Sequence, residues 1–258
     1  MSGACLSPPL FQWRHSLNIE RNYNMNTIPS TPDLHTDADL GLSYRIRQPV
    51  PLKPTRCVVL LHGVGGNETN LIDFAAGIDP QTLVIFPRGP LQLAAQQFAW
   101  FRVAFTSAGP SIVAEEAESS REALIHFVQQ VQARYGISAR NTVIAGFSQG
   151  GILSASVALS APERVAGFGI LSGRILPELT PHIADKGRLE NLRAFIGHGE
   201  FDTKLPVMWA QRSDQLLGEL GVAHLTHLYP IDHGISLAMK TDFLEWLDGL
   251  LKVSVNGN

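Results

Sequence analysis

The chain has 258 residues, of which 20 are Lys or Arg and 23 are Asp or Glu, so its formal net charge is −3 with neutral histidines. Binding to nucleic acid or to an anionic membrane surface depends on clustered basic side chains, and this balance, without a basic run, argues against both kinds of partner. Hydrophobic residues make up 45 % of the chain and charged residues 17 %, which is enough for one large core and excludes disorder over most of its length.

The first 41 residues contain four prolines and several asparagines and keep neither helical nor strand periodicity. We expect them to form a poorly ordered leader, with Met25 as a second possible start, and residues 42–258 to form a single domain. The leader lacks a basic residue followed by an apolar block, which argues against a secretory signal. The longest apolar stretch, 57–61, is far shorter than the ~18 residues of a membrane span. With Cys5 and Cys57 interpreted as free thiols, these features predict a cytoplasmic protein.

From residue 42 onward, short apolar runs rich in Val and Ile alternate with longer stretches of helical periodicity. This alternation is typical of an α/β domain with a mostly parallel sheet and helices on both faces. The expected strands are 58–61, 82–86, 142–145, 168–171, 193–196 and 224–229, and the expected helices are 112–134, 152–159, 206–220 and 235–251. The connection 89–110 is long, aromatic and irregular in pattern, and loops of that length are more often functional than idle.

A G-x-S-x-G sequence, Gly146-Phe147-Ser148-Gln149-Gly150, lies between the third expected strand and the second expected helix. A tight reversal at this point holds the serine in a strained backbone conformation, and its flanking glycines avoid collisions with the neighbouring strand and helix. Ser148 would then be exposed at the carboxyl edge of the sheet as a nucleophile. The alternative is a Gly-rich turn without chemistry.

A serine nucleophile needs a base, and the base needs an acid that orients it. In this architecture the chain order is Ser, then Asp or Glu, then His, and Asp202 and His233 each follow an expected strand after Ser148. The carboxyl ends of the strands in an open α/β sheet gather catalytic groups, so these three side chains are expected to converge. Asp232 and Glu200 remain minor alternatives for the acid. The histidines that compete for the base lie in a turn, in the last strand or on a helix: His198, His224, His227 and His126.

An oxyanion hole needs backbone N–H groups directed at the developing negative charge. The amide of Gln149, the residue after the nucleophile, is one expected donor. The Gly-rich loop 61–66, which follows an earlier strand, is expected to supply the other. That loop lacks the lysine of a phosphate-binding P-loop, and the chain has neither a dinucleotide fingerprint nor a helical H-E-x-x-H metal motif, so no cofactor and no metal are expected.

The connection 89–110 and the segment 171–177 follow other strands and are expected to enclose an apolar substrate pocket, with Trp100, Phe101 and Leu176 as candidate lining residues. Ordinary core packing would explain the same aromatic residues. The same two segments contain Arg102 and Arg174, which could meet an anionic group of a substrate, although a solvated surface position is the commoner fate of an arginine.

Taken together, these motifs resemble the phospholipase/carboxylesterase family of α/β-hydrolases, which includes the acyl-protein thioesterases. The matching segments are Leu61-His62-Gly63-Val64-Gly65, Trp100-Phe101, Gly146-Phe147-Ser148-Gln149-Gly150, Leu171-Ser172-Gly173, Gly197-His198-Gly199-Glu200-Phe201-Asp202 and Asp232-His233-Gly234. The resemblance spans roughly residues 42–252. It implies an α/β-hydrolase fold, a Ser148–Asp202–His233 triad, and an oxyanion hole formed by the amides of Val64 and Gln149. The chain departs from the family at Arg102, where Asp is usual, and in the loop after Val64.

The expected function is therefore hydrolysis of a small-molecule carboxylic ester, or of a thioester or lysophospholipid, through an acyl-enzyme on Ser148. One alternative is a serine peptidase or amidase with the same triad. Another is an α/β-hydrolase scaffold that binds a ligand or a protein without catalysis. Acyl length, ester against thioester, and monomer against homodimer stay open.

Overall fold

The computed structural model describes residues 31–106 and 109–253. Residues 1–30, most of the predicted leader, lie outside the described residues. The compact unit begins at Pro32, ahead of the domain boundary expected at residue 42. Within this early stretch Leu40 is only 1 % exposed, and His35 pairs with Tyr44 through main-chain hydrogen bonds of 2.8 and 3.0 Å. Residues 32–41 therefore pack as part of the domain.

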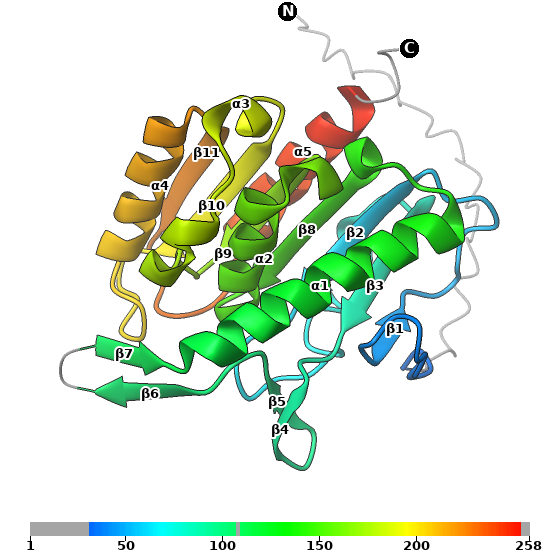
Figure 1. Cartoon of the computed structure of the whole chain (residues 1–258), viewed down its shortest axis with the longest axis horizontal. Helices are drawn as coiled ribbons and strands as arrows, with labels where there is room; N and C mark the ends of the chain where they lie inside the picture. The colour runs from blue at the N-terminus through cyan, green and yellow to red at the C-terminus, as the bar shows by residue number, and fades with distance from the viewer. Residues whose placement is uncertain (1–30, 107–108, 254–258) are drawn as a thin grey trace, which may run out of the picture. The chain divides into compact units, whose positions relative to one another are not determined.

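The domain is built on a central sheet, which has seven strands within the described ranges (Figure 1). In spatial order these are β1 (Tyr44–Ile46), β3 (Thr82–Pro87), β2 (Arg56–Leu61), β8 (Thr142–Phe147), β9 (Gly167–Leu171), β10 (Arg193–Gly199) and β11 (Ala223–Tyr229). Only β1 runs antiparallel to its neighbour, so the predicted mostly parallel sheet and all six predicted strands are confirmed. The edge strand β1 was not predicted, because three residues are too few to establish an alternation.

Helices cover both faces of this sheet, as predicted. In Figure 1, α1 (Ala114–Tyr135), α2 (Gln149–Ser160) and α4 (Met208–Leu220) cross one face, and α5 (Leu237–Val253) lies behind the other. The shorter helical elements are α3 (Lys186–Leu189) and the turns Phe74–Gly77, Ala139–Asn141, Pro162–Arg164 and Pro177–His182. Helix α1 ends at Gly136, whose φ of 65° is the left-handed conformation that glycine adopts easily at a helix end.

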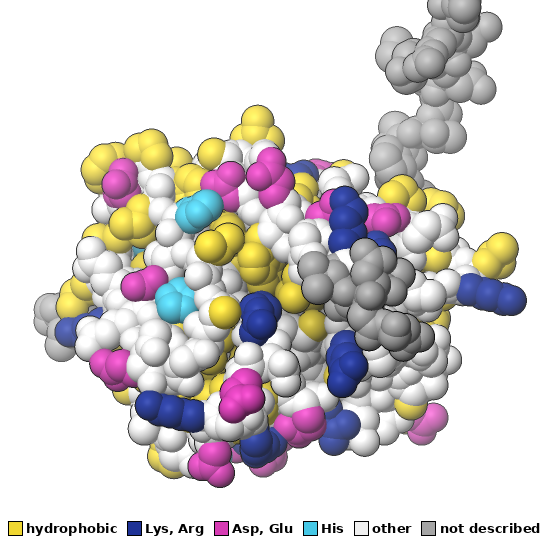
Figure 2. Space-filling model, turned by 90° about the horizontal axis from the view of Figure 1, so that it is seen from above, with side chains coloured by type: hydrophobic (Ala, Val, Ile, Leu, Met, Phe, Trp, Pro, Cys, Tyr) yellow, Lys and Arg dark blue, Asp and Glu magenta, His cyan; other side chains and the backbone are white. Residues whose placement is uncertain are grey.

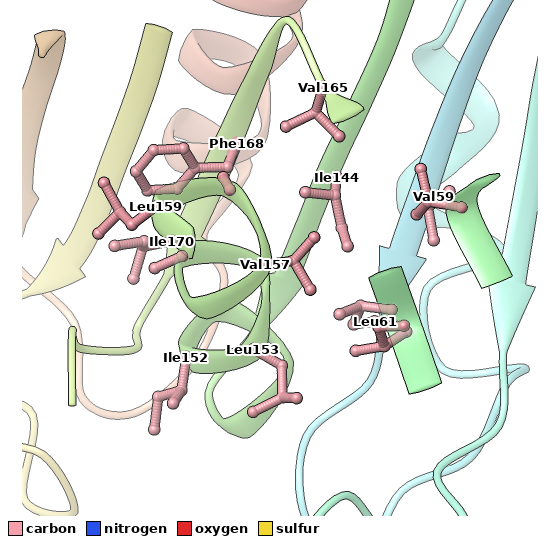
Figure 3. Close-up of a cluster of buried hydrophobic side chains, with 14 of the residues drawn as sticks. Val59, Leu61, Ile144, Ile152, Leu153, Val157, Leu159, Val165, Phe168 and Ile170 are labelled. Carbon is pink, nitrogen blue, oxygen red and sulfur yellow. The ribbon is translucent and has the colours of Figure 1, made fainter. Parts of the chain in front are cut away.

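Each central strand contributes side chains to two cores because successive residues of a strand point to opposite faces. In β2, Val59 and Leu61 pack under α1 and α2, whereas Val58 and Leu60 pack against α5 and the turn at Phe74. Figure 3 shows the first of these cores, where side chains of α2 meet those of β2, β8 and β9. Burial on both faces explains why these strands are continuous apolar runs in the sequence.

The connection 89–110 is more regular than its sequence suggested. It contains one antiparallel hairpin, β4 (Leu91–Ala94) with β5 (Gln97–Ala99), and most of a second, β6 (Val103–Thr106) with β7 (Gly109–Ile112). Both lie outside the central sheet. Their strands are three or four residues long, which is too short for an alternation of apolar and polar residues to predict them.

The surface in Figure 2 shows basic and acidic side chains interspersed, with hydrophobic side chains between them. This face therefore has no extended field of one sign, in keeping with the charge balance of the sequence. Among the described residues, every helix is too short or too polar to cross a lipid bilayer.

Candidate active site

Ser148 lies at the junction of β8 and α2 in a backbone conformation that non-glycine residues rarely adopt. Its φ is 53° and its ψ is −116°. The turn leaves no room for side chains on either side, since a Cβ at Gly146 would lie 2.5 Å from the carbonyl carbon of Gly150, and one at Gly150 would lie 2.1 Å from the Leu61 oxygen. Such strain costs on the order of 1–3 kcal/mol and persists where surrounding structure enforces it, often at functional sites.

The structure brings Ser148, Asp202 and His233 together from three separate segments. His233 Nδ1 lies 2.7 Å from Asp202 Oδ2, and His233 Nε2 lies 2.9 Å from Ser148 Oγ. Asp202 follows β10, and His233 lies between β11 and α5, so both come from the carboxyl edge of the sheet. A proton on Nδ1 leaves Nε2 free to accept the hydroxyl proton of Ser148.

Asp202 is fixed by hydrogen bonds other than the one to His233. Its Oδ1 accepts from the amides of Lys204, at 2.9 Å, and Leu205, at 2.7 Å. His198 lies behind it, with Nε2 at 2.7 Å from the Leu205 carbonyl oxygen and 3.4 Å from Asp202 Oδ2. Burial lowers the pKa of His198, so its ring stays neutral and donates to the Leu205 carbonyl. This histidine thus supports the turn that carries the acid.

The other candidates for acid and base lie in different surroundings. Asp232 accepts hydrogen bonds from the amide and the hydroxyl of Thr203, at 2.8 and 2.9 Å, and Glu200 is exposed. His224 and His227 contact Asp214 and Asp242, and His126 contacts the Asp39 carbonyl. The hydrogen bonds of the described residues connect none of these groups to Ser148.

The two backbone amides expected in an oxyanion hole belong to residues that line the same small cavity as Ser148, namely Val64 and Gln149. Neither amide donates a hydrogen bond to an acceptor among the described residues. The loop of Val64 is held on β5, because Gly65 N donates to the Phe98 oxygen and Phe98 N donates to the Gly66 oxygen, both at 2.8 Å.

The buried carboxylate of Glu68 connects the loop that carries Val64 to two neighbouring strands. Glu68, 2 % exposed, receives Arg45 Nε at 2.8 Å from β1, and Arg88 Nε at 2.6 Å and Nη2 at 2.7 Å from the end of β3. Burial by itself raises the pKa of Glu68, but the hydrogen bonds from the two guanidinium groups outweigh it and lower the value to about 2. Arg88 also lies over the ring of Phe98, 4.4 Å from its centroid, and so connects Glu68 to β5.

The side chain of Gln149 joins the nucleophile segment to the connection after β5. Its Oε1 accepts from the amide of Trp100 at 2.8 Å, and its Nε2 donates to the Phe101 oxygen at 2.6 Å. Trp100 Nε1 in turn donates to the His62 carbonyl oxygen at 2.9 Å. The His62 ring accepts from the amide of Gly89 at 3.0 Å, and its pKa is lowered by burial. These contacts fix the cavity walls relative to Ser148.

The cavity beside Ser148 and His233 has a volume of about 30 Å³, and Phe101 is the one predicted pocket residue among those that line it. Trp100 and Leu176 are fully or almost fully buried in the core under α1 and α2. The structure thus places them behind the cavity wall, as ordinary packing would. The remaining lining is apolar except for two cations: Val103, Ile112, Ile152, Leu205, Arg174 and Lys204.

The two arginines of the pocket segments have different surroundings. Arg102 is exposed and pairs with Glu116, as expected of a surface arginine. Arg174 was expected at the surface as well, but it is 4 % exposed and lines the cavity. In the sequence Arg174 lies three residues after the predicted strand 168–171, a position that does not distinguish the two fates.

Three features of the site cannot be predicted from the sequence. These are the hydrogen bonds of the Gln149 side chain, the support of Asp202 by His198, and the burial of Arg174. Each depends on residues far apart in the chain, so no local spacing reveals it. No group of three or more His, Cys, Asp or Glu side chains in the described ranges is arranged to hold a metal ion.

Comparison with known proteins places the chain in a family. The model of the phospholipase/carboxylesterase family matches residues 47–250. Acyl-protein thioesterase 1 of Kluyveromyces lactis is 26 % identical over 224 residues, which cover 78 % of this chain and 95 % of that protein. Acyl-protein thioesterase 1 of Emericella nidulans is 25 % identical over 234 residues, which cover 81 % of this chain and 96 % of that protein.

Solved structures share the fold. Esterase PE8 superposes with a TM-score of 0.72 at 23 % identity and covers 81 % of this chain and 99 % of that one. The carboxylesterase from Mesorhizobium loti has a TM-score of 0.70 at 23 % identity, with 84 % of this chain and 99 % of that one covered. These likenesses confirm the predicted α/β-hydrolase fold. Since the family model spans most of the domain, the chain belongs to the phospholipase/carboxylesterase family of α/β-hydrolases.

Proposed function

We propose that the chain hydrolyses carboxylic esters through an acyl-enzyme on Ser148, with His233 as general base and Asp202 as the acid that orients it. The observation that carries the proposal is the continuous pair of hydrogen bonds from Asp202 through His233 to Ser148 Oγ, at 2.7 and 2.9 Å. Membership of the family makes the chain an ester hydrolase, and these contacts supply the residues for the reaction.

In the first half of the reaction, Ser148 Oγ attacks the ester carbonyl carbon while His233 Nε2 takes the hydroxyl proton. Negative charge develops on the carbonyl oxygen, where the amides of Val64 and Gln149 donate hydrogen bonds. Asp202 stabilises the imidazolium that forms, without itself taking the proton. His233 then returns its proton to the leaving alcohol, and the acyl group stays on Ser148.

In the second half, water replaces the alcohol. His233 removes a proton from this water, which attacks the acyl-enzyme, and the same amides stabilise the second oxyanion. Breakdown returns the proton to Ser148 and releases the acid. The fixed Ser148 backbone and the bonds that hold Asp202 keep the groups aligned in both halves.

The same chemistry applies to thioesters and to lysophospholipids, which differ from simple esters in the leaving group. The names of the two fungal relatives favour thioesters as one class to be tested. The cavity of about 30 Å³ is lined largely by apolar side chains, which suit the acyl carbons next to the ester carbonyl. The cytoplasmic location stays a prediction from the sequence.

The test is pre-steady-state hydrolysis of p-nitrophenyl esters of graded acyl length. Wild type is expected to release a burst of p-nitrophenol. The kcat of Ser148→Ala is expected to fall by several powers of ten, because only the oxyanion hole and substrate binding then contribute to catalysis. Ser156→Ala, on the same helix, is the matched control, since its hydroxyl only bonds the Ile152 oxygen. A fluorophosphonate probe should label wild type and this control at Ser148.

Two results would contradict the proposal in different ways. Hydrolysis at wild-type rate in Ser148→Ala would remove Ser148 from the mechanism. The absence of turnover on any ester or thioester, by protein that is folded, would favour the alternative of a binding scaffold without catalysis. Cleavage of amides at rates similar to those of esters would favour the peptidase or amidase alternative.

A further inference from the structure

Arg174 is a buried cation without an anionic partner. The residue is 4 % exposed, and its Nε is buried without a hydrogen-bond acceptor among the described residues. Among the described residues no carboxylate lies within ion-pair distance of its guanidinium group. Its guanidinium group lies over the ring of Trp209, whose centroid is 4.2 Å from Cζ. Burial lowers the pKa of Arg174, because removing the charged guanidinium group from water disfavours its protonated form.

Other shielded arginines of the domain have acceptors. Arg45 and Arg88 share the carboxylate of Glu68, and Arg47 donates to four backbone carbonyl oxygens at 2.7 to 3.1 Å. Burying a charged group costs free energy unless the group is paired with an opposite charge or hydrogen-bond acceptors, so most buried arginines have such partners. The stacking on Trp209 offsets only part of that cost. Arg174 therefore carries a guanidinium group with room for an acceptor that none of the described residues supplies.

The position of Arg174 identifies where that acceptor would come from. Arg174 lines the cavity that Ser148 and His233 also line, and Lys204 is a second cation on the same wall. The lining includes no Asp or Glu. Glu178 is the acidic residue whose charge acts on Arg174, but it is exposed and beyond ion-pair distance. The carboxylate of Asp202 lies behind His233 and is already hydrogen-bonded. The lining of the cavity beside the nucleophile thus contains two cationic side chains among largely apolar ones.

We propose that Arg174 binds a carboxylate group of the substrate, so that the preferred substrates are esters that carry a carboxylate close to the scissile bond. This inference rests on the proposed function and specifies its substrate class. A guanidinium group matches a carboxylate with two parallel hydrogen bonds, and a site closed to water strengthens them. The carboxylate belongs either to the acyl part, as in a half-ester of a dicarboxylic acid, or to the alcohol part, as in an ester of a hydroxy acid.

The test compares each carboxylate ester with its neutral carboxamide isostere, so that shape stays constant while charge changes. Glutarate monomethyl ester and methyl glutaramate probe the acyl side, with methanol release as the measurement. O-acetyl glycolate and O-acetyl glycolamide probe the alcohol side, with acetate release as the measurement. The readout is the carboxylate-to-carboxamide ratio of kcat/KM within one protein preparation, which cancels differences in the folded fraction.

In wild type we expect this ratio to exceed that of Arg174→Met by about 10- to 100-fold on one of the two sides, the range expected for hydrogen bonds to a charged group. Arg174→Lys should retain part of the preference, since it keeps the charge but loses the planar fork. Arg212→Met is the matched control. Its guanidinium also lies over Trp209, at 4.9 Å, but Arg212 is exposed and does not line the cavity.

The outcomes separate this inference from the proposed function. Equal ratios in wild type and Arg174→Met on both sides, with esters still hydrolysed, would overturn the anion site and leave the esterase intact. Binding of glutarate monomethyl ester to Ser148→Ala protein, measured by calorimetry, tests the site without turnover. If the Ser148→Ala/Arg174→Met protein does not bind this ester but the Ser148→Ala/Arg212→Met protein does, the anion site is supported, even if no ester is hydrolysed. Absence of binding together with equal ratios would refute it.

Discussion

At the scale of single residues, two aspartates compete for one role. Asp232 is adjacent to His233 in the sequence, yet its carboxylate accepts hydrogen bonds from Thr203. Asp202 is 31 residues away and meets His233 Nδ1 at 2.7 Å. Neighbouring side chains of a loop point in different directions, so proximity in sequence is a poor guide to contact.

We expect Asp202→Asn to lower kcat by about 10⁴-fold, because an amide in this position favours the wrong tautomer of His233 and cannot stabilise its imidazolium form. Asp232→Asn is the control and should have a far smaller effect. The measurement is steady-state hydrolysis of a p-nitrophenyl ester by both variants. A larger loss in Asp232→Asn than in Asp202→Asn would assign the acid to Asp232.

At the scale of elements, Glu68 connects three parts of the fold. It pairs with Arg45 of the edge strand β1 and with Arg88 after β3, while its own loop continues the segment that carries Val64. Breaking a buried ion pair costs more than an exposed one, because the remaining charges lose their partner in a shielded environment. The loop after β2 that carries Val64 is thus connected through Glu68 to the edge strand β1.

Glu68→Gln is therefore expected to lower the free energy of unfolding by about 3 kcal/mol, measured by urea denaturation near neutral pH. The ordinary pKa of 4.5 falls to about 2 on folding, so the contribution of Glu68 is complete above pH 4.5 and is lost as the pH falls toward 2. Glu116→Gln, which breaks the exposed pair with Arg102, is the control and should change stability little. Equal effects of the two variants would contradict this account.

At the scale of the whole molecule, two buried histidines couple stability to pH. Burial lowers the pKa of both His62 and His198 from the ordinary 6.5, so the folded state keeps them neutral where the unfolded chain binds protons. Since the unfolded state then binds more protons, stability rises with pH in this window. The contribution of the two neutral rings is fully present above about pH 6.5 and is lost as the pH falls toward their lowered pKa values.

We expect the free energy of unfolding to fall between about pH 7 and about pH 5.5, by up to about 1.4 kcal/mol per pH unit for each ring. Urea denaturation at several pH values measures the slope. The variants His62→Gln and His198→Gln should each have a shallower slope than wild type, whatever their absolute stability. A wild-type stability that is constant over this interval would contradict the prediction.

The sequence predicted much of the fold because the central strands are buried on both faces. Val58–Leu61 and Val143–Ala145 are apolar without interruption, and runs of this kind form buried strands in many tertiary contexts. The strands that it missed, β1 and those of the two hairpins, have three or four residues each. Their pairing is decided by what they pack against, so local pattern carries little information about them.

The sequence by itself determined the family, the fold class and the candidates for the triad, because Ser148, Asp202 and His233 each follow a strand and strand ends meet at one sheet edge. Only the tertiary structure decided which groups stand around them. It placed His198 behind Asp202, Trp100 and Leu176 in the core, and Arg174 in the cavity. The physical reason is that burial and pairing of a side chain depend on residues distant in the chain, whereas strand and turn formation depend on neighbours.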